Sequence, residues 1–550
     1  MGLLSFLGFT LLVAFIAWRS TRNTNEDSSD GYFLAGRSLT AGVIAGSLLL
    51  TNLSTEQIVG LNGQAYTEGI LVMAWETLAA MAMVVTAVFL LPRYLKGGIT
   101  TVPQFLERRY DTLTKSLTAG LFLSGYVVIL LPIVLYSGAV AFSAMFDLPS
   151  LLGVSKTASL WICVWGIGII GSIYAIFGGL KAVAVSDTIN AIGLLIGGLL
   201  IPIFGLLYIG DGSVGAGISM LMDSHPDKFN SIGSNTASVP FATIFTGMML
   251  VQLFYWGTNQ AIIQRALGAK NLEEGQKGLL LASFLKILGP IVVVLPGIIA
   301  YHIFQGQLEV PDEAYPKLVA KVLPAGLVGF FAAVLFGAIL SSFNSALNSS
   351  VTLFGIDIYK EYIKKDATEK QIVKAGKIFG IGLAILAMFI APAIANAPDG
   401  LFGYLQEING CYSIPIFTII VVGYLTKYVP ALAAKVALIL GAGMYIISQF
   451  VMKPAMVKSA LSRAEASGIT DVAQLADIEK LAYPHFLHVM AILFVLNIAI
   501  MLVIGMLKPR EIAYEQTYTK QVDISPWKYV NHIGVVITLI VIAIYIFFAR

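Results

Sequence analysis

A run of polar side chains interrupts a long apolar segment between Ser47 and Gly60. The polar residues are Asn52, Ser54, Thr55, Glu56 and Gln57. A carboxylate at this depth in a membrane is costly unless it faces water, a partner or a ligand. The pattern predicts a helix that is broken near the bilayer midplane, where freed carbonyls and side chains line a binding site. The alternative interpretation is a helix cap or a packing contact between helices.

A second polar run that contains glycine lies further along the chain. It reads Gln252-Leu253-Phe254-Tyr255-Trp256-Gly257-Thr258-Asn259-Gln260, again inside an apolar segment. Two interrupted helices at matching positions of two halves are typical of inverted-repeat transporters, whose binding site lies where the breaks face each other. The halves share no sequence identity visible by eye, so this prediction depends on the spacing and on the paired interruptions. Taken alone, such aromatic residues more often indicate packing than binding.

Glu76 and Lys286 place charges inside two further predicted spans. An unpaired charge at the bilayer centre costs about 2.5 to 3.5 kcal/mol on insertion scales, so each residue needs a partner or water. The two could form a buried ion pair that only fixes helix packing. They could instead neutralise each other across a cavity and hydrogen-bond to a polar solute there.

Amide side chains would complete the recognition of such a solute. A polyhydroxylated ligand needs donors and acceptors together, and Gln57, Gln252 and Gln406 supply both. Trp75 or Tyr255 could pack against an apolar face of a sugar. This inventory suits a neutral sugar or polyol better than a hydrophobic or strongly anionic ligand.

Hydroxyl side chains on another apolar span could hold a cation. Ser341 and Ser342 either bond back to the preceding helical turn or coordinate Na⁺ together with carbonyls freed by a break between Leu50 and Leu53. Asp187 stands near the start of a span, where it is either a helix cap or part of a cation pathway.

The composition indicates an integral membrane protein. The chain has 550 residues, of which 57% are hydrophobic and 12% are charged, whereas soluble domains carry about 25% charged residues. Long apolar runs without strict alternation favour helices over a β-barrel. A net charge of +3 gives no reason to expect nucleic acid, and the two cysteines lie in apolar segments, so a disulfide or metal site is not expected. His485 and His488 share a helical face but lack further ligands.

About 14 transmembrane helices are predicted from apolar runs near 20 residues. They are 2–18, the interrupted segment around 47–60, 70–92, 115–146, 157–178, 185–209, 239–264, 278–303, 324–355, 374–394, 401–426, 431–452, 485–507 and 532–549. Lys and Arg concentrate in the loops after the third, seventh and ninth spans, which predicts an N-terminus outside the cell. The loop 453–484 is long enough to hold a small helix, and no loop is large enough for an enzymatic domain.

Several motifs together resemble the sodium/solute symporter family, in particular its sodium–sugar cotransporter branch, over nearly the whole chain. They are Thr51-Asn52-Leu53-Ser54-Thr55-Glu56-Gln57, Phe254-Tyr255-Trp256-Gly257-Thr258-Asn259-Gln260, Gln264-Arg265, Ser341-Ser342 and Asp357-Ile358-Tyr359-Lys360-Glu361-Tyr362. The resemblance implies an all-α, LeuT-like core of five plus five inverted helices at about 39–426, with two discontinuous helices. Extra helices would flank the core at 1–38, which includes a polar linker at 23–30, and at 427–550.

The resemblance also implies site residues. The family's Na⁺ site would fall on the backbone carbonyls of Leu50, Leu53 and Ala338 and on the hydroxyls of Ser341 and Ser342. The sugar contacts of the bacterial sodium/galactose symporter would fall on Gln57, Glu76, Gln252, Lys286 and Gln406, its inner-gate tyrosine on Tyr255, and an aspartate of the Na⁺ pathway on Asp187.

Three positions depart from the family pattern. Gln252 stands where the galactose symporter has Asn, and Ala79 replaces a polar contact. These changes leave galactose itself unassigned while a sugar is still expected. Asn344 stands where members with a second Na⁺ site carry a small hydroxyl residue, which favours one Na⁺ per cycle.

The expected function is Na⁺-coupled uptake of a sugar or related polar solute through the plasma (inner) membrane by alternating access. The expected partners are Na⁺, a small-molecule substrate and the lipid bilayer, with a monomer sufficient for transport. A symporter for an amino acid, carboxylate or vitamin, with Na⁺ or H⁺, is the first alternative. A membrane sensor that moves nothing uphill is the second. An enzyme is not expected, because no catalytic constellation stands in the spans.

Overall fold

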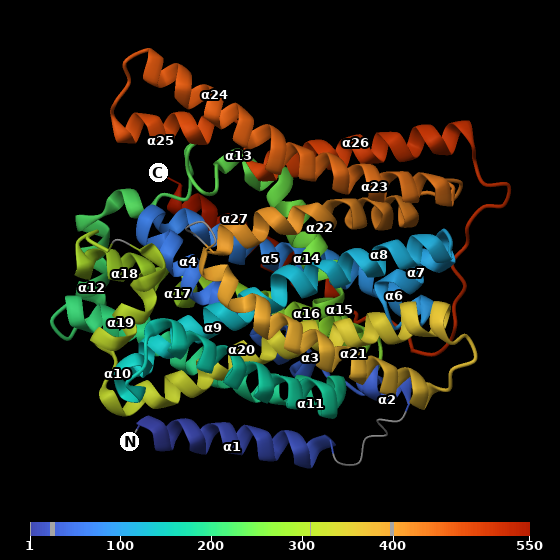
Figure 1. The fold of residues 1–550 in the computed structure, drawn as a ribbon, viewed down its shortest axis with the longest axis horizontal. Coiled ribbons are helices and arrows are strands. Elements are labelled where there is room, and N and C mark those ends of the chain that lie inside the picture. The colour runs from blue at the N-terminus through green and yellow to red at the C-terminus, as the bar shows by residue number, and fades with distance from the viewer. Residues whose placement is uncertain (1, 22–27, 309, 397–400, 550) are drawn as a thin grey trace.

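The computed structural model describes residues 2–21, 28–308, 310–396 and 401–549, and it is a bundle of helices that run mostly side by side (Figure 1). Within these ranges there is no β-strand, only one isolated bridge between Leu39 and Ala269. The predicted linker at 23–30 lies mostly outside the described residues.

The helices of the first third of the chain are α1 (Gly2–Thr21), α2 (Ser29–Leu34), α3 (Ala41–Asn52), α4 (Thr55–Glu68), α5 (Ala74–Val85), α6 (Leu91–Gly97), α7 (Val102–Arg109), α8 (Thr112–Gly125), α9 (Leu131–Phe146), α10 (Leu148–Leu152) and α11 (Lys156–Ile209). Those of the middle are α12 (Val214–Ser224), α13 (Phe241–Thr243), α14 (Met249–Gly257), α15 (Gln260–Leu267), α16 (Leu272–Ile287), α17 (Gly289–Val293), α18 (Leu295–Phe304), α19 (Ala314–Val322) and α20 (Ala325–Leu353).

The remaining helices are α21 (Glu369–Ile390), α22 (Leu401–Leu425), α23 (Ala431–Ile447), α24 (Lys453–Ala466), α25 (Val472–Leu481), α26 (Phe486–Leu507) and α27 (Val530–Phe548). Short 3₁₀ or π segments continue or join them: η1 (Ala35–Arg37), η2 (Gly69–Met73), η3 (Thr86–Leu90), η4 (Tyr126–Leu130), η5 (Pro226–Phe229), η6 (Ile244–Met248), η7 (Pro311–Glu313), η8 (Phe354–Ile363), η9 (Ala391–Asn396) and η10 (Ser448–Met452). The loop 453–484 holds the helices α24 and α25, which confirms that this loop is structured.

Membrane spans can be counted in two ways. Ten helical stretches in the described ranges are long and apolar enough to cross a bilayer, or up to 12 if two bent pairs are each one span. One stretch, Thr55–Gly97, contains a turn at Gly69, where φ is +83°. If this stretch is divided at Gly69, with α3 joined to α4, it counts as two spans. With the shorter apolar helix α1 added, the count of spans rises from 12 to the 14 that the sequence predicts.

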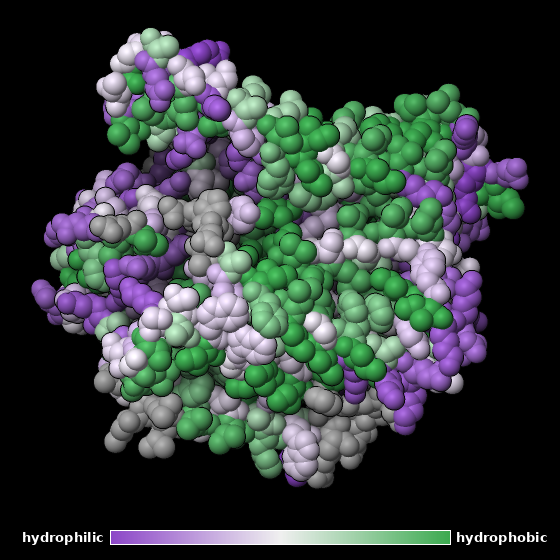
Figure 2. Space-filling view, viewed as in Figure 1, coloured by the Kyte–Doolittle hydropathy of each residue, from purple (hydrophilic) through white to green (hydrophobic). Residues whose placement is uncertain are grey.

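One face of the molecule has an apolar band between two polar ends. Hydrophobic residues cover the middle of the face shown in Figure 2, and hydrophilic residues gather at its left and right ends. The helices run from one polar end to the other (Figure 1). This arrangement is expected when lipid surrounds the middle of the bundle and water covers its two ends.

The interrupted helices occupy the interior of the bundle. The half-helix α3 packs against α11, α16 and α20, whereas α4 packs against α18 and α22. The second pair is placed similarly, because α14 contacts α5 and α22 and α15 contacts α3 and α20. In Figure 1, α1 lies along one side of the molecule and α23 and α26 along the opposite side. A core at 39–426 with flanking helices remains a prediction.

Candidate functional site

The first predicted break lies between α3 and α4. The α3 helix ends at Asn52, Leu53 leaves helical geometry with ψ of 60°, and Ser54 is extended with ψ of 174°. The Ser54 N–H donates to the carbonyl of Asn52 (2.8 Å), not to the carbonyl four residues earlier. Among the described residues, the carbonyls of Leu50 and Leu53 therefore receive no backbone hydrogen bond. Short polar residues are common where a helix ends, although the Ser54 side chain makes no cap hydrogen bond to α4 here.

The second predicted break lies between α14 and α15, which meet at an angle of 48°. Asn259 begins the second half as its cap, since its side-chain oxygen accepts from the Ala261 N–H at 3.0 Å. The hydroxyl of Tyr126, from η4, donates to the same oxygen at 2.6 Å. Both predicted interruptions are thus confirmed.

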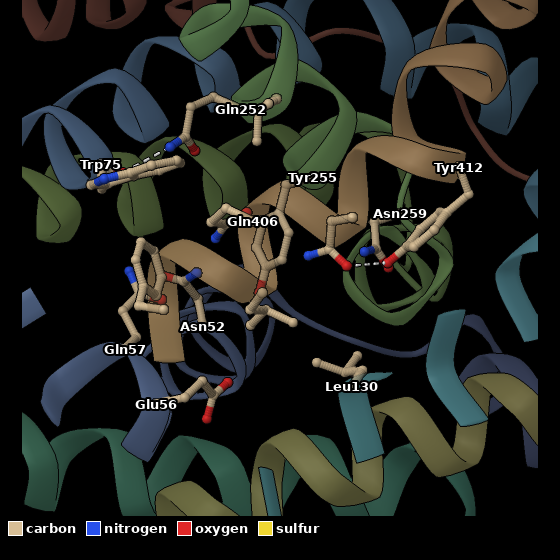
Figure 3. A pocket seen from close by; sticks show the side chains of 14 residues that line it. Asn52, Glu56, Gln57, Trp75, Leu130, Gln252, Tyr255, Asn259, Gln406 and Tyr412 are labelled. Carbon is tan, nitrogen blue, oxygen red and sulfur yellow. Dashed lines mark hydrogen bonds between the residues drawn. The ribbon is translucent and has the colours of Figure 1, made fainter. Parts of the chain in front are cut away.

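A cavity of about 50 Å³ lies between the two breaks (Figure 3). Its lining comes from α3, α4, α5, η4, the second interrupted helix and α22: Asn52, Glu56, Gln57, Trp75, Leu130, Val251, Gln252, Tyr255, Asn259, Phe402, Leu405, Gln406, Asn409 and Tyr412. A single water needs about 10–15 Å³, so the cavity has room for a few waters. A sugar-sized ligand requires the wall to open.

Four of the six predicted substrate residues line this cavity together: Gln57, Gln252, Tyr255 and Gln406. Gln252 is held in place, because its Nε2 donates to the Trp75 carbonyl (3.0 Å) and its Oε1 accepts from the Trp256 indole (3.1 Å). The amides therefore present polar groups from three separate helices to one space.

Glu76 and Lys286 lie directly behind the wall and are not part of the lining. They form an ion pair at 2.5 Å, and both side chains are fully buried. The second oxygen of Glu76 accepts from the Gln57 amide, and the Lys286 ammonium also donates to the Asn52 side chain. The pair thus fixes two residues that do line the cavity, and it neutralises itself by direct contact, not across the cavity.

The lining includes residues that the sequence analysis did not assign as ligands. Glu56 has a buried carboxylate oxygen, Oε2, with no hydrogen-bond partner in the described part of the chain. On α22, Phe402, Leu405, Asn409 and Tyr412 share the face of Gln406. The spacing of three, four and seven residues in this group is the signal that could have found them.

Two of the five predicted Na⁺ residues, Ser341 and Ser342, contact the broken end of α3 at Thr51. The Ser342 hydroxyl donates to the Thr51 carbonyl at 2.9 Å, and the Ser341 hydroxyl lies 3.3 Å from the Thr51 hydroxyl. Ala338 is fully buried one turn earlier on α20. The carbonyls of Leu50 and Leu53 at this end of α3 are free of backbone hydrogen bonds, and oxygen atoms of this kind suit a hard cation such as Na⁺.

Asp187 belongs to a buried network beside these residues. A kink at Gly179 divides α11 into two helices, and Asp187 lies well inside the second one, so it is not a helix cap. Its carboxylate accepts from the Ser47 hydroxyl at 2.6 Å and lies 3.8 Å from the guanidinium of Arg265. Arg265 donates to Ser47 (3.0 Å) and to Ser345. The Ser345 hydroxyl is in turn 3.2 Å from that of Thr51, so the network reaches the candidate cation site.

A second cavity of about 30 Å³ lies behind this network, between α1, α11 and α20. Asp187, Asn190, Ser341 and Asn344 are among its lining residues. The Asn344 side-chain oxygen is buried without a hydrogen-bond partner in the described ranges. Water or a passing cation would satisfy it.

Comparison with known proteins places these features in a family context. Residues 32–441 match the sodium:solute symporter family. The uncharacterized symporter YidK of Escherichia coli strain K12 is 47% identical over 543 residues, which is 99% of this chain and 90% of that protein. The sodium/glucose cotransporter of Vibrio parahaemolyticus is 33% identical over 455 residues, which is 77% of this chain and 81% of that protein.

A solved structure shares the fold. It is that of a Na⁺-coupled sialic acid symporter in a substrate-bound outward-open state, with a TM-score of 0.70 and 19% sequence identity. The match covers 93% of this chain and 99% of that one. The LeuT-like all-α fold with two discontinuous helices, which the sequence predicts, is therefore confirmed.

Proposed function

Because the chain belongs to the sodium:solute symporter family, we propose that it uses the Na⁺ gradient across the plasma membrane to accumulate a sugar or a related polyol. Family membership makes it a multi-pass membrane transporter and not an enzyme. The residues that line the cavity between the two breaks are the basis for the proposed class of substrate. Its wall offers amides and hydroxyls, and no Lys, Arg or His stands among its lining residues.

This lining favours a neutral solute rich in hydroxyl groups. Gln57, Gln252 and Gln406 can each donate and accept, and the unpaired oxygen of Glu56 accepts a ligand hydroxyl. An anionic substrate would find no cation in the wall, since Lys286 is already paired with Glu76. The relative from Vibrio parahaemolyticus carries the name sodium/glucose cotransporter, which supports a sugar as the class of substrate.

Aromatic side chains complete the proposed sugar site. Trp75 and Phe402 meet edge to face with ring centroids 5.1 Å apart at the cavity wall, where they offer an apolar surface to a sugar face. Tyr255 is half-buried and extends into the same space (Figure 3). We assign it the role of the inner gate, which must move aside before the sugar leaves.

Na⁺ would be held by the carbonyls of Leu50, Leu53 and Ala338 and by the hydroxyls of Ser341 and Ser342. The ion then bridges the broken end of α3 and the α20 helix. A cation shifts a conformational equilibrium only if it binds one state better than the other. We propose that the outward-facing state brings these oxygens together best, so Na⁺ favours the conformation that receives the sugar.

The Asp187 network is proposed to lie on the route by which Na⁺ leaves. Its charge is balanced by Arg265 at 3.8 Å, so the carboxylate is not a free second cation site in this conformation. Together with Asn344 in place of a hydroxyl residue, this arrangement supports one Na⁺ per cycle. A single chain supplies every proposed ligand, which supports a functional monomer.

The proposed function is tested by uptake into proteoliposomes that contain the purified protein. An inward Na⁺ gradient is imposed, and labelled hexoses, cyclitols, amino acids and carboxylates are offered in turn. We expect accumulation of a hexose or cyclitol only with Na⁺, with K⁺ in its place as the control. An imposed H⁺ gradient without Na⁺ should drive none.

Three results would contradict the proposal. Concentrative uptake of an amino acid or carboxylate but of no sugar would place the protein elsewhere in its family. Uptake driven equally by H⁺ alone would make Glu56 or Asp187 a proton site. Saturable binding of a sugar without any accumulation would indicate a sensor.

A further inference from the structure

Two histidine side chains meet at the polar end of the molecule where α12 and α18 lie (Figure 1). His225 directly follows α12, and His302 lies in the last turn of α18. The Nε2 atom of His225 is 3.1 Å from the Nδ1 atom of His302. Both rings are partly exposed, so solvent ions reach them. Neither residue has a role in the proposed transport sites.

These nitrogens lie at hydrogen-bond distance, and the same separation also fits two ligands of one metal ion. Zinc binds imidazole nitrogen at about 2.0–2.1 Å. Two such bonds at an angle between 90° and 109° put the nitrogens about 2.9 to 3.4 Å apart. Imidazole selects zinc, copper and nickel over calcium and magnesium. No group of three or more His, Cys, Asp or Glu gathers in the described part of the chain, so water would complete the coordination.

Two charged residues follow His225 closely in the chain, Asp227 and Lys228, and Asp227 is exposed. The neighbouring Lys228 ammonium is committed elsewhere, because it donates to the carbonyls of Tyr66 and Thr67.

The two histidines stand on elements that both hold the half-helix α4. On one side, η5 lies against the end of α4, so closely that a Cβ on Gly69 would come 2.7 Å from the Lys228 Cα. On the other side, the α18 backbone N–H of Gly297 donates to the Asn62 side chain of α4 at 2.8 Å. An ion shared by His225 and His302 would join these two supports.

We propose that His225 and His302 form a binding site for a transition-metal dication of the zinc type, which clamps η5 to α18 across the end of α4. This site is separate from the proposed sugar and Na⁺ sites. The other close pair, His485 and His488, is committed differently, since the Nδ1 atom of His485 caps the Leu487 N–H at 3.3 Å and that of His488 lies 3.0 Å from the Thr246 hydroxyl.

The experiment titrates ZnCl₂ into the full-length purified protein, prepared without a polyhistidine tag, and records binding by calorimetry and Tm by thermal unfolding. We expect saturable binding of one ion per chain, with a Tm that rises with Zn²⁺ and returns on addition of EDTA. Each of His225→Gln and His302→Gln should weaken binding by about tenfold or more, as loss of a metal contact does. Mg²⁺ at the same concentrations should leave Tm unchanged.

The matched control is the double variant His485→Gln, His488→Gln, which should bind Zn²⁺ like the natural protein. The proposal is overturned if the natural protein shows no saturable Zn²⁺ binding, which would make His225 and His302 a hydrogen-bonded pair only. It is also overturned if either single variant binds with unchanged affinity, or if the control variant loses binding. No outcome depends on the transported solute, so this test stands apart from the uptake experiment.

Discussion

At the scale of single residues, the same side-chain type has different consequences depending on its partners. Ser342 and Ser350 are both buried on α20. Ser350 bonds back to the Ala346 carbonyl of its own helix at 2.8 Å, whereas Ser342 reaches across to the Thr51 carbonyl of α3. Of these two hydroxyls, only that of Ser342 connects two elements. Only it lies against the broken end of α3, where we propose that the cation binds.

Removal of the Ser342 hydroxyl should therefore weaken Na⁺ coupling. A hydrogen-bond or ligand contact to a charged group is worth about 1.5–3 kcal/mol, so Ser342→Ala should raise the Na⁺ concentration for half-maximal uptake about 10- to 100-fold. The Na⁺ dependence of uptake in proteoliposomes measures this shift. Ser350→Ala is the matched control and should leave it unchanged. An unaltered Na⁺ dependence in Ser342→Ala would remove this residue from the cation site.

Removing one charge of the ion pair behind the cavity should destabilise the protein more than removing both charges. Lys286→Met leaves the Glu76 carboxylate buried without its cation, which costs about 3–5 kcal/mol of stability. Adding Glu76→Gln removes that charge and should restore most of the loss, because the two sites are coupled. Thermal unfolding in detergent measures both variants. If Glu76→Gln causes a further loss of stability in the Lys286→Met protein instead of restoring it, the two charges are not coupled.

At the scale of elements, the two breaks are built by different means. The first is a change of backbone geometry at Leu53 and Ser54, where the Ser54 N–H donates to the Asn52 carbonyl and the Ser54 side chain does not cap α4. The second depends on a side chain from another element. The Asn259 side-chain oxygen accepts a hydrogen bond from the Tyr126 hydroxyl, and both of these oxygen atoms lie 3.0 Å from the Ala261 backbone nitrogen. The α15 helix thus begins where η4 supports it.

Loss of this cap should destabilise the second break. Asn259→Ala removes a helix cap worth about 0.5–2 kcal/mol and leaves the buried Tyr126 hydroxyl without its acceptor, so the unfolding free energy should fall by about 1–3 kcal/mol. Asn259→Ser keeps a capping oxygen and should lose less. Unfolding of these variants with and without Tyr126→Phe measures the coupling. Strict additivity would mean that η4 does not support the start of α15.

At the scale of the whole molecule, the apolar spans and the two polar ends seen in Figure 2 fix the axis along which the chain crosses a bilayer. They do not fix which end faces the cytoplasm. The distribution of Lys and Arg among the loops favours an N-terminus outside. The loop that carries His225 would then also lie outside, and the segment between α26 and α27 inside.

This orientation is tested with single cysteines at exposed positions. Ser234→Cys, in the loop after α12, should react with a membrane-impermeant maleimide in intact cells. Ser525→Cys, in the segment before α27, should react only after the membrane is permeabilised. The natural protein gives the background, because Cys163 is buried and Cys411 is half-buried. The reverse pattern of labelling would invert the topology.

The sequence by itself determined the class of fold and the positions of both interruptions. Apolar runs of membrane length admit only helices, because lipid offers no hydrogen bonds to an open backbone. Polar residues at Asn52–Gln57 and near Gly257 then mark the places where the helices cannot continue. The amides Gln57, Gln252 and Gln406 could be singled out because polar groups at such depth need a partner.

Only the tertiary structure decided which of these groups face the cavity and which stand behind it. Glu76 and Lys286 looked like cavity residues, yet they pair directly and reach the cavity only through Gln57 and Asn52. Three further features depend on contacts between segments far apart in the chain. They are the exposure of the Asn409 face of α22 to the cavity, the unpaired oxygen of Glu56 and the contact between His225 and His302. A pattern along one helix specifies which face is polar, but the packing of the other helices specifies what that face touches.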